Sequence, residues 1–198
     1  MNIESNFDYL IKLVLLGDST VGKTNLVLRF TENRFSENSL PTLGYDFKSK
    51  IITLKSKKKA KLQIWDTAGQ ERFMSLSKSI FQRVDAIMLV YDITNIITFN
   101  NLENWIKKIK EFNDTMPIML VGNKTDLNEE RIVRYEDGKN LANENKMQFL
   151  EASALNGENV DKAFVSFGNE IFNCLKKKLI DDRFSLESNK KRKKKKCC

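Results

Sequence analysis

Several features that mark other protein classes are scarce in this sequence. It has only eight glycines and two prolines in 198 residues, which argues against a collagen-like or low-complexity chain. Its three cysteines are Cys174, within an apolar helical pattern, and the last two residues, so we expect no disulfide framework and a reducing compartment. The first apolar run follows no basic segment and is too short to span a membrane, so we expect neither a signal peptide nor a transmembrane helix.

Positive charge is concentrated at one end of the chain. The formal net charge is +8, and residues 190–196 read KKRKKKK, which leaves about +1 for all other residues. A basic surface spread over the folded part, as in many nucleic-acid-binding domains, is not indicated. We therefore expect no nucleic-acid partner.

The pattern of apolar residues predicts an α/β fold. Short, nearly continuous apolar runs, which are typical of strands buried on both faces, alternate with longer segments of helical periodicity. The expected strands are 9–16, 45–55, 61–66, 86–92, 117–122 and 147–151, and the expected helices are 22–31, 98–112, 135–145 and 159–178. This order predicts a six-stranded, mostly parallel sheet with helices on both faces. The second and third strands read as a hairpin, which makes one edge strand antiparallel.

These elements predict one domain with short extensions. We expect an N-terminal extension at 1–8 and a globular domain at 9–178. The periodicity stops near residue 180, so residues 179–198 are expected to form a disordered basic tail. No internal repeat is visible.

The first chemical motif follows the first expected strand and opens the first expected helix. It matches the phosphate-loop pattern G-x-x-x-x-G-K-[ST] and comprises Gly17, Asp18, Ser19, Thr20, Val21, Gly22, Lys23 and Thr24. The backbone N–H groups of such a loop and the N-terminus of the next helix bind phosphates. Lys23 would supply positive charge to the outer phosphates and the Thr24 hydroxyl would ligate Mg²⁺. The loop alone predicts only a nucleoside triphosphate.

A second motif, DTAGQE at 66–71, supplies groups for the terminal phosphate. Asp66 ends an apolar strand, where its carboxylate can hold Mg²⁺ through water. Gly69 lets the backbone approach the phosphate closely, and Gln70 can orient an attacking water molecule.

A third motif, NKTD at 123–126, indicates which base the bound nucleotide carries. The Asp126 carboxylate can accept two hydrogen bonds from guanine that adenine does not offer, and the stem of Lys124 can cover one face of the base. Asn123 opens the motif directly after an expected strand. The short pattern is informative because it follows the other two in order and spacing.

The order of these motifs carries a family resemblance. GDSTVGKT, DTAGQE, NKTD and EASA (151–154) resemble the Ras superfamily of small GTPases over about residues 8–178. Within it, the chain is most similar to the Rab family in LGYDF (43–47), KLQIW (61–65), LVYDIT (89–94) and the terminal Cys-Cys. The resemblance implies a P-loop NTPase small G domain that binds GTP and GDP with Mg²⁺ and hydrolyses GTP slowly.

The resemblance also implies roles for residues outside those motifs. Thr42 would sense the γ-phosphate and ligate Mg²⁺, and Phe35 would lie against the guanine edge. Ala154, between Ser153 and Leu155, would offer its N–H to the guanine carbonyl, and Leu155 replaces a lysine that is common in the family. The implied effector surface comprises Leu43, Gly44, Phe47, Trp65 and Ile80, the last in place of a third aromatic ring.

The tail implies a lipid anchor by the same resemblance. Cys197 and Cys198 would be geranylgeranylated, and two lipids together with the basic run would hold the protein at the cytoplasmic face of an intracellular membrane, from which it cycles to the cytosol. The implied protein is a monomer. Its implied partners are an exchange factor, a GTPase-activating protein, a GDP dissociation inhibitor, a prenylation escort protein and effectors that bind the GTP form.

Three alternatives are weighed against this interpretation. A non-catalytic GTP-binding scaffold is disfavoured by Gln70, and another P-loop class, such as a nucleotide kinase, by NKTD. A nuclear GTPase addressed by its basic tail is disfavoured by the terminal Cys-Cys. The compartment, the effectors and the consequences of Leu155 and Ile80 are left open by the sequence.

Overall fold

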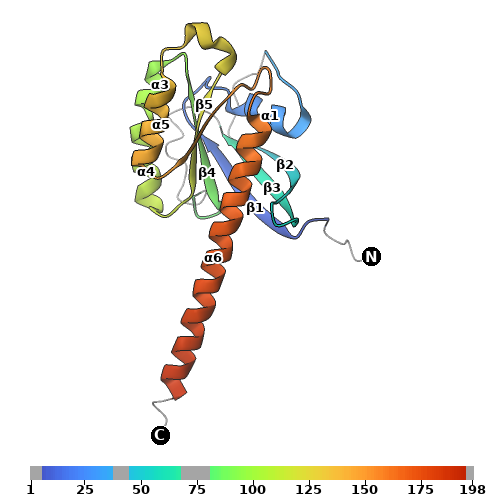
Figure 1. The fold of residues 1–198 in the computed structure, drawn as a ribbon, viewed down its shortest axis with the longest axis vertical. Coiled ribbons are helices and arrows are strands. Elements are labelled where there is room, and N and C mark those ends of the chain that lie inside the picture. Colours follow the sequence, from blue (N-terminus) through green and yellow to red (C-terminus); the bar gives the residue numbers. More distant parts are fainter. Residues whose placement is uncertain (1–5, 38–44, 68–80, 195–198) are drawn as a thin grey trace.

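The computed structural model describes residues 6–37, 45–67 and 81–194, and Figure 1 shows a central sheet with helices around it. The side chains of Tyr45 and of residues 179–194 are outside this description. The strands are β1 Tyr9–Leu16, β2 Tyr45–Thr53, β3 Lys59–Thr67, β4 Ala86–Asp92, β5 Ile118–Asn123 and β6 Gln148–Ala152. The helices are α1 Lys23–Glu32, α3 Ile96–Asn100, α4 Leu102–Phe112, the 3₁₀ helix η2 Thr125–Glu130, α5 Tyr135–Glu144 and α6 Val160–Lys194.

The sheet has the order β2-β3-β1-β4-β5-β6, in which every pair is parallel except β2 and β3. The antiparallel pair arises because a short turn joins the two strands, and the Leu54 N–H donates to the Lys58 carbonyl at 2.8 Å across it. The predicted six-stranded, mostly parallel sheet with one antiparallel edge strand is confirmed.

Two apolar clusters pack on opposite faces of the sheet. On β1, Ile11, Leu13 and Leu15 contribute to the cluster with α1 and α6, whereas Val14 and Leu16 contribute to the cluster with α4 and α5. This alternation follows from the period of two along a strand, and it explains why β1 reads as a continuous apolar run. Helices therefore cover both faces, as predicted.

The helix expected over 98–112 differs from the structure. It begins earlier, at Ile96, because the Asn95 side chain accepts a hydrogen bond from the Ile97 N–H at 3.0 Å and caps the first turn. It is also divided at Asn101 into α3 and α4.

The last helix also differs from the expectation. The backbone of α6 is helical to Lys194, past residue 178 where the domain was expected to end, and it extends well away from the sheet (Figure 1). The expectation of a disordered tail thus differs from the helical backbone at 179–194. The physical reason is that no glycine or proline follows Gly168, and residues 179–194 are rich in lysine and arginine and contain two leucines, all of which favour helix.

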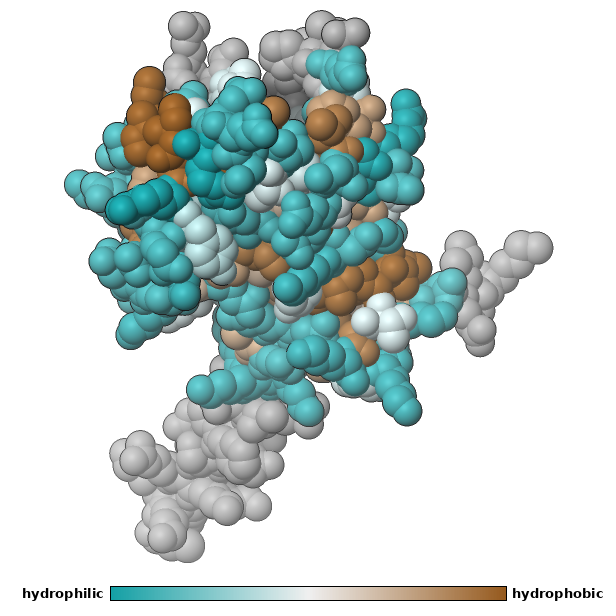
Figure 2. All heavy atoms as spheres, turned by 45° about the horizontal axis from the view of Figure 1, so that its top comes forward, coloured by the Kyte–Doolittle hydropathy of each residue, from teal (hydrophilic) through white to brown (hydrophobic). Residues whose placement is uncertain are grey.

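The exposed face in Figure 2 is mostly hydrophilic, with apolar atoms gathered in a few areas. Within the three described ranges, no helix combines the length and the apolar character needed to cross a membrane. In open α/β sheets, ligands bind at the carboxyl ends of the parallel strands, so a functional site is expected at that edge of this sheet.

Candidate functional site

The predicted motifs meet at the carboxyl edge of the sheet. The phosphate loop connects β1 to α1, Asp66 lies near the end of β3, Asn123 ends β5, and Ser153 follows β6. In an open α/β sheet, ligands bind outside the carboxyl ends of the strands. The fold therefore brings together motifs that are up to about 130 residues apart in the sequence.

The phosphate loop has a backbone that requires glycine at two positions. Gly17 has a φ of +135° and Gly22 a φ of +91°. A Cβ at Gly17 would collide with the Val90 carbonyl oxygen of β4, and one at Gly22 would collide with the Asn123 amide. Glycine is therefore needed both for the conformation and for the close approach of neighbouring strands.

Lys23 is held inside this loop. Its ammonium donates to the Gly17 carbonyl at 2.9 Å and to the Asp18 carbonyl at 2.7 Å, and the residue is buried. Burial lowers the pKa of Lys23 to about 8, while the Asp66 and Asp18 carboxylates act in the opposite direction. A cation that is already desolvated and positioned in a loop of backbone N–H groups suits binding of phosphate oxygens.

Thr24 and Asp66 are brought together from α1 and β3. The Thr24 hydroxyl donates to Asp66 Oδ2 at 2.6 Å, and Asp66 is buried. The neighbouring Thr67 hydroxyl donates to the Leu15 carbonyl at 2.7 Å, which ties the end of β3 to β1. A hydroxyl and a carboxylate next to a phosphate loop are oxygen donors that fit Mg²⁺, which binds one or two protein ligands together with substrate phosphates.

Asn123 connects two loops of the site. Its Nδ2 donates to the Val21 carbonyl at 2.8 Å, and its Oδ1 accepts from the Ala154 N–H at 3.2 Å. Asn123 is 1% exposed, so these bonds are made in the interior. The side chain that was predicted to touch guanine thus joins the phosphate loop to the loop after β6.

Asp126 and Ser153 form the next contact. The Ser153 hydroxyl donates to Asp126 Oδ1 and also accepts from the N–H groups of Leu155 and Asn156, each at 3.2 Å. Ser153 therefore fixes the orientation of the Asp126 carboxylate and folds the loop that carries Leu155. The side chain of Leu155 is 45% exposed, so it offers apolar surface beside that carboxylate.

Two residues that the sequence analysis missed support this part of the site. The buried Asp92, at the end of β4, pairs with the Lys124 ammonium at 2.5 Å through Oδ2, and its Oδ1 accepts from the Thr94 N–H and hydroxyl. Arg29 of α1 donates to the carbonyls of Ala154 and Leu155 at 2.9 and 2.6 Å. Asp92 carried a detectable signal, an acid at the end of a buried strand, whereas Arg29 looked like any charged residue on a helix.

Of the predicted aromatic residues, Phe35 and Trp65 pack against the apolar clusters, whereas Phe47 is exposed. Phe35 is half-buried against the α1–α6 cluster, and the segment that carries it is held by a pair of hydrogen bonds between the Asn25 side chain and the Ser36 backbone, at 3.0 and 3.1 Å. Phe47 and Trp65 are opposite each other on β2 and β3 and meet edge to face with ring centroids 5.9 Å apart.

The remaining predicted site residues lie outside the described part of the chain. These are Thr42, Leu43, Gly44, Gly69, Gln70, Ile80, Cys197 and Cys198. Their roles stay predictions.

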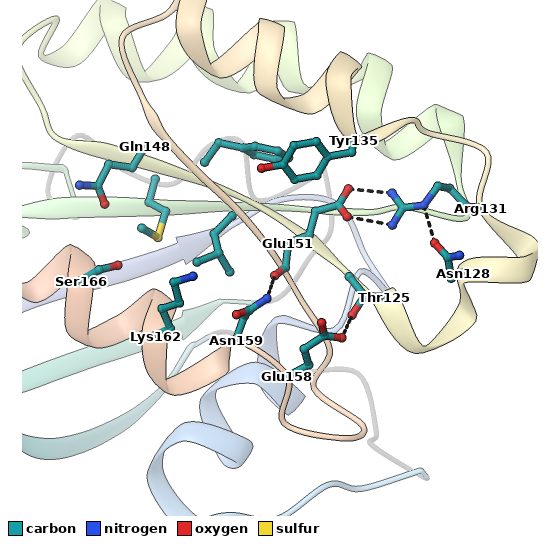
Figure 3. Close-up of a pocket in the computed structure, with 13 residues that line it drawn as sticks. Thr125, Asn128, Arg131, Tyr135, Gln148, Glu151, Glu158, Asn159, Lys162 and Ser166 are labelled. Atoms are coloured by element: carbon teal, nitrogen blue, oxygen red, sulfur yellow. Dashed lines mark hydrogen bonds and ion pairs between the residues drawn. The ribbon is translucent and has the colours of Figure 1, made fainter.

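A separate hollow of about 660 Å³ lies beside β6 and the start of α6 (Figure 3). Its main polar feature is an ion pair in which Arg131 donates to both oxygens of the Glu151 carboxylate, at 2.7 and 2.8 Å. Thr125 donates to Glu158 at 2.9 Å across the same hollow, and this contact links the NKTD segment to the loop after β6. The hollow thus lies next to the predicted guanine site without including the phosphate loop.

Comparison with known proteins supports the resemblance found in the sequence. The sequence model of the Ras family matches residues 12–173. Ras-related protein Rab-8B of Bos taurus is 46% identical over 180 residues, which cover 90% of this chain and 86% of the relative. Rab-8B of Dictyostelium discoideum is 43% identical over 181 residues (91% and 87%), and RABA2d of Arabidopsis thaliana is 43% identical over 179 residues (90% and 82%).

Proposed function

This chain belongs to the Rab group of the Ras family of small GTPases, and from that premise we propose how its own residues bind and switch the nucleotide. As a member of that group it hydrolyses GTP to GDP and phosphate and acts in vesicle traffic. The relatives do not favour the alternatives of a non-catalytic scaffold or a nuclear GTPase. The observation that carries the proposal is the Thr24–Asp66 contact beside the buried Lys23.

The phosphate side of the site is assigned to the loop 17–24. Its N–H groups and Lys23 hold the phosphates, and Thr24, Thr42 and, through water, Asp66 hold Mg²⁺. When bound at these residues, Mg²⁺ would supply positive charge against the phosphates. Gly69 donates to the γ-phosphate and Gln70 orients the attacking water. In the segments that would surround the γ-phosphate we assign no internal arginine finger, so we expect slow intrinsic turnover and an activating protein that raises the rate roughly 10³–10⁵-fold.

The base side of the site is assigned to two loops that Asn123 and Ser153 hold together. Asp126 accepts from guanine, Lys124 and Leu155 cover its faces, and Phe35 lies at its edge. The Ala154 N–H, which donates to Asn123 Oδ1 in this structure, would donate to the guanine carbonyl instead. The hydrogen bonds of Asp126 to Ser153 and of Lys124 to Asp92 support this assignment, because they pre-orient both side chains.

Protein partners at membranes distinguish the GTP form of the protein from its GDP form. Loss of the γ-phosphate would release Thr42 and Gly69 and change the surface that includes Leu43, Gly44, Phe47, Trp65 and Ile80. Effectors bind the GTP form of the monomer, and an exchange factor, an activating protein, a GDP dissociation inhibitor and an escort protein for prenylation complete the cycle. The tail 179–198 carries the lipid anchor on Cys197 and Cys198.

The metal assignment is tested by measuring GDP affinity with Mg²⁺ and with EDTA. Asp66→Asn should weaken GDP binding at least tenfold in Mg²⁺ and change it little in EDTA. Thr67→Val is the matched control, because it removes a neighbouring buried hydrogen bond that has no metal role. If Asp66→Asn weakens binding equally in both solutions, Asp66 does not act through the metal.

The anchor is tested by imaging an N-terminally tagged protein beside a variant with Cys197→Ser and Cys198→Ser. The wild type should mark discrete intracellular membranes and the variant should be cytosolic. Accumulation of both in the nucleus would contradict the anchored switch while leaving the GTPase activity intact.

A further inference from the structure

The second residue of the phosphate loop makes a set of contacts that nucleotide binding does not explain. Asp18 Oδ1 accepts from the Trp105 indole N–H at 2.9 Å, and Asp18 Oδ2 accepts from the Asn101 amide at 2.7 Å. Asn101 precedes α4 and Trp105 lies in its first turn. Both carboxylate oxygens are therefore bonded to one helix that is 83 or more residues away in the sequence.

The local chemistry favours this arrangement over a solvated carboxylate. Hydrogen bonds to an ionised carboxylate are stronger than those between neutral groups, and a helix N-terminus favours negative charge. Asn101 is at the N-cap of α4, yet its side chain makes no capping bond to that helix and donates to Asp18 instead. Trp105 is 4% exposed, so its N–H would lose a buried hydrogen bond without Asp18.

The carboxylate and the backbone carbonyl of Asp18 have different partners, because the carboxylate is bonded to Asn101 and Trp105. The same residue's backbone carbonyl accepts from the Lys23 ammonium at 2.7 Å. An unrestrained carboxylate in a phosphate loop would repel the anionic ligand. Its bonds to Asn101 and Trp105 hold the charge against α4 and fix the peptide unit that orients Lys23.

We propose that Asp18, Asn101 and Trp105 form a cluster that positions the phosphate loop, with Asp18 as a positioning residue for nucleotide binding. This inference rests on the assignment of residues 17–24 to the phosphates. It adds α4, a helix with no predicted site residue, to the elements that determine how long the nucleotide stays bound.

The first experiment measures release of a fluorescent GDP analogue from the full chain in Mg²⁺. Asp18→Ala should speed release about tenfold, which corresponds to about 1.4 kcal/mol. Asn101→Ala and Trp105→Phe, which each remove one donor, should each speed it about threefold. In the Asp18→Ala background, Trp105→Phe should add nothing, because the bond is already absent.

The control is Asn113→Ala at the other end of α4. It removes the hydrogen bonds that Asn113 accepts from the Thr115 N–H and hydroxyl, but it contacts no residue of the loop. Its release rate should equal that of the wild type. If it releases GDP as fast as Trp105→Phe, the effect reflects helix stability and the proposal is wrong.

A spectroscopic measurement separates positioning from general loss of stability. The chain has two tryptophans, so Trp105→Phe assigns the indole proton of Trp105 in an NMR spectrum. Asp18→Ala should shift that resonance in the folded, GDP-bound protein, whereas Asn113→Ala should leave it in place. An unshifted resonance would show that the bond is absent in solution.

The outcomes also separate this inference from the proposed function. A wild type that fails to retain GDP in Mg²⁺ would overturn the nucleotide assignment itself. A wild type that retains GDP, with Asp18→Ala within twofold of its release rate, would overturn only the role of the cluster.

Discussion

Arg29 provides the sharpest test of how the guanine loop is held. It donates to two consecutive carbonyls of that loop, Ala154 and Leu155, at 2.9 and 2.6 Å. A partly exposed hydrogen bond from a charged donor contributes about 1 kcal/mol, so the two together contribute about 2 kcal/mol. If that free energy is expressed in nucleotide binding, Arg29→Ala speeds GDP release about 30-fold, since 1.4 kcal/mol is tenfold.

Two comparisons give this prediction its controls. Arg29→Lys retains the charge but can donate only from one point, so its release rate should be intermediate, about fivefold above the wild type. Arg34→Ala removes a nearby exposed ion pair with Glu32, at 3.5 Å, and should leave the rate unchanged. The assay is stopped-flow release of a fluorescent GDP analogue in Mg²⁺. A rate for Arg29→Ala within twofold of that for Arg34→Ala would refute the reasoning.

Three further predictions concern stability, measured by urea or thermal unfolding of the GDP-bound protein. Gly138→Ala should cost about 1–3 kcal/mol, because its Cβ would lie 2.5 Å from Tyr91 Oη, and Tyr91→Phe should restore part of that loss. Arg131→Met should cost about 3 kcal/mol because it leaves the Glu151 carboxylate buried without its partner, whereas the double change Arg131→Met with Glu151→Leu should cost less. Burial raises the pKa of Glu170 above its ordinary value of 4.5, so the free energy of unfolding falls as the pH rises from 4.5 through the raised pKa. Glu170→Gln should therefore raise the thermal midpoint at pH 7 but not at pH 4. An equal rise at both pH values would exclude the carboxylate charge as the cause.

Apart from the C-terminal end of α6, the expected helices and strands were placed to within a few residues, because their signals are local. β1, β4 and α5 begin at the expected residues, since apolar runs and helical periodicity depend only on residues that are close together in the sequence. The break at Asn101 was not predictable in this way. The side-chain amide of Asn101 donates a hydrogen bond to Asp18, which lies more than 80 residues earlier in the chain.

Some features of the candidate site could likewise be predicted from the sequence, and others could not. Loop motifs such as GDSTVGKT can be recognised in a sequence because their backbone requires glycine at fixed positions. In the structure, Gly17 and Gly22 have the positive φ angles that explain this requirement. Arg29 lies in none of the motifs, and Asp92 belongs to LVYDIT but was assigned no role; their contacts form because α1 begins, and β4 ends, at the same edge of the sheet as the loops they hold.

Sequence alone determined the class of fold, the phosphate loop, the guanine motif and membership of the Rab group, because these depend on residue types at short, fixed spacings. Only the tertiary structure decided which side chains hold those motifs in place. Asn123 joins two loops, Ser153 orients Asp126, and α4 binds Asp18. The reason is physical: a hydrogen bond depends on distance in space, and distant segments become neighbours only when the parallel strands pair and their carboxyl ends meet.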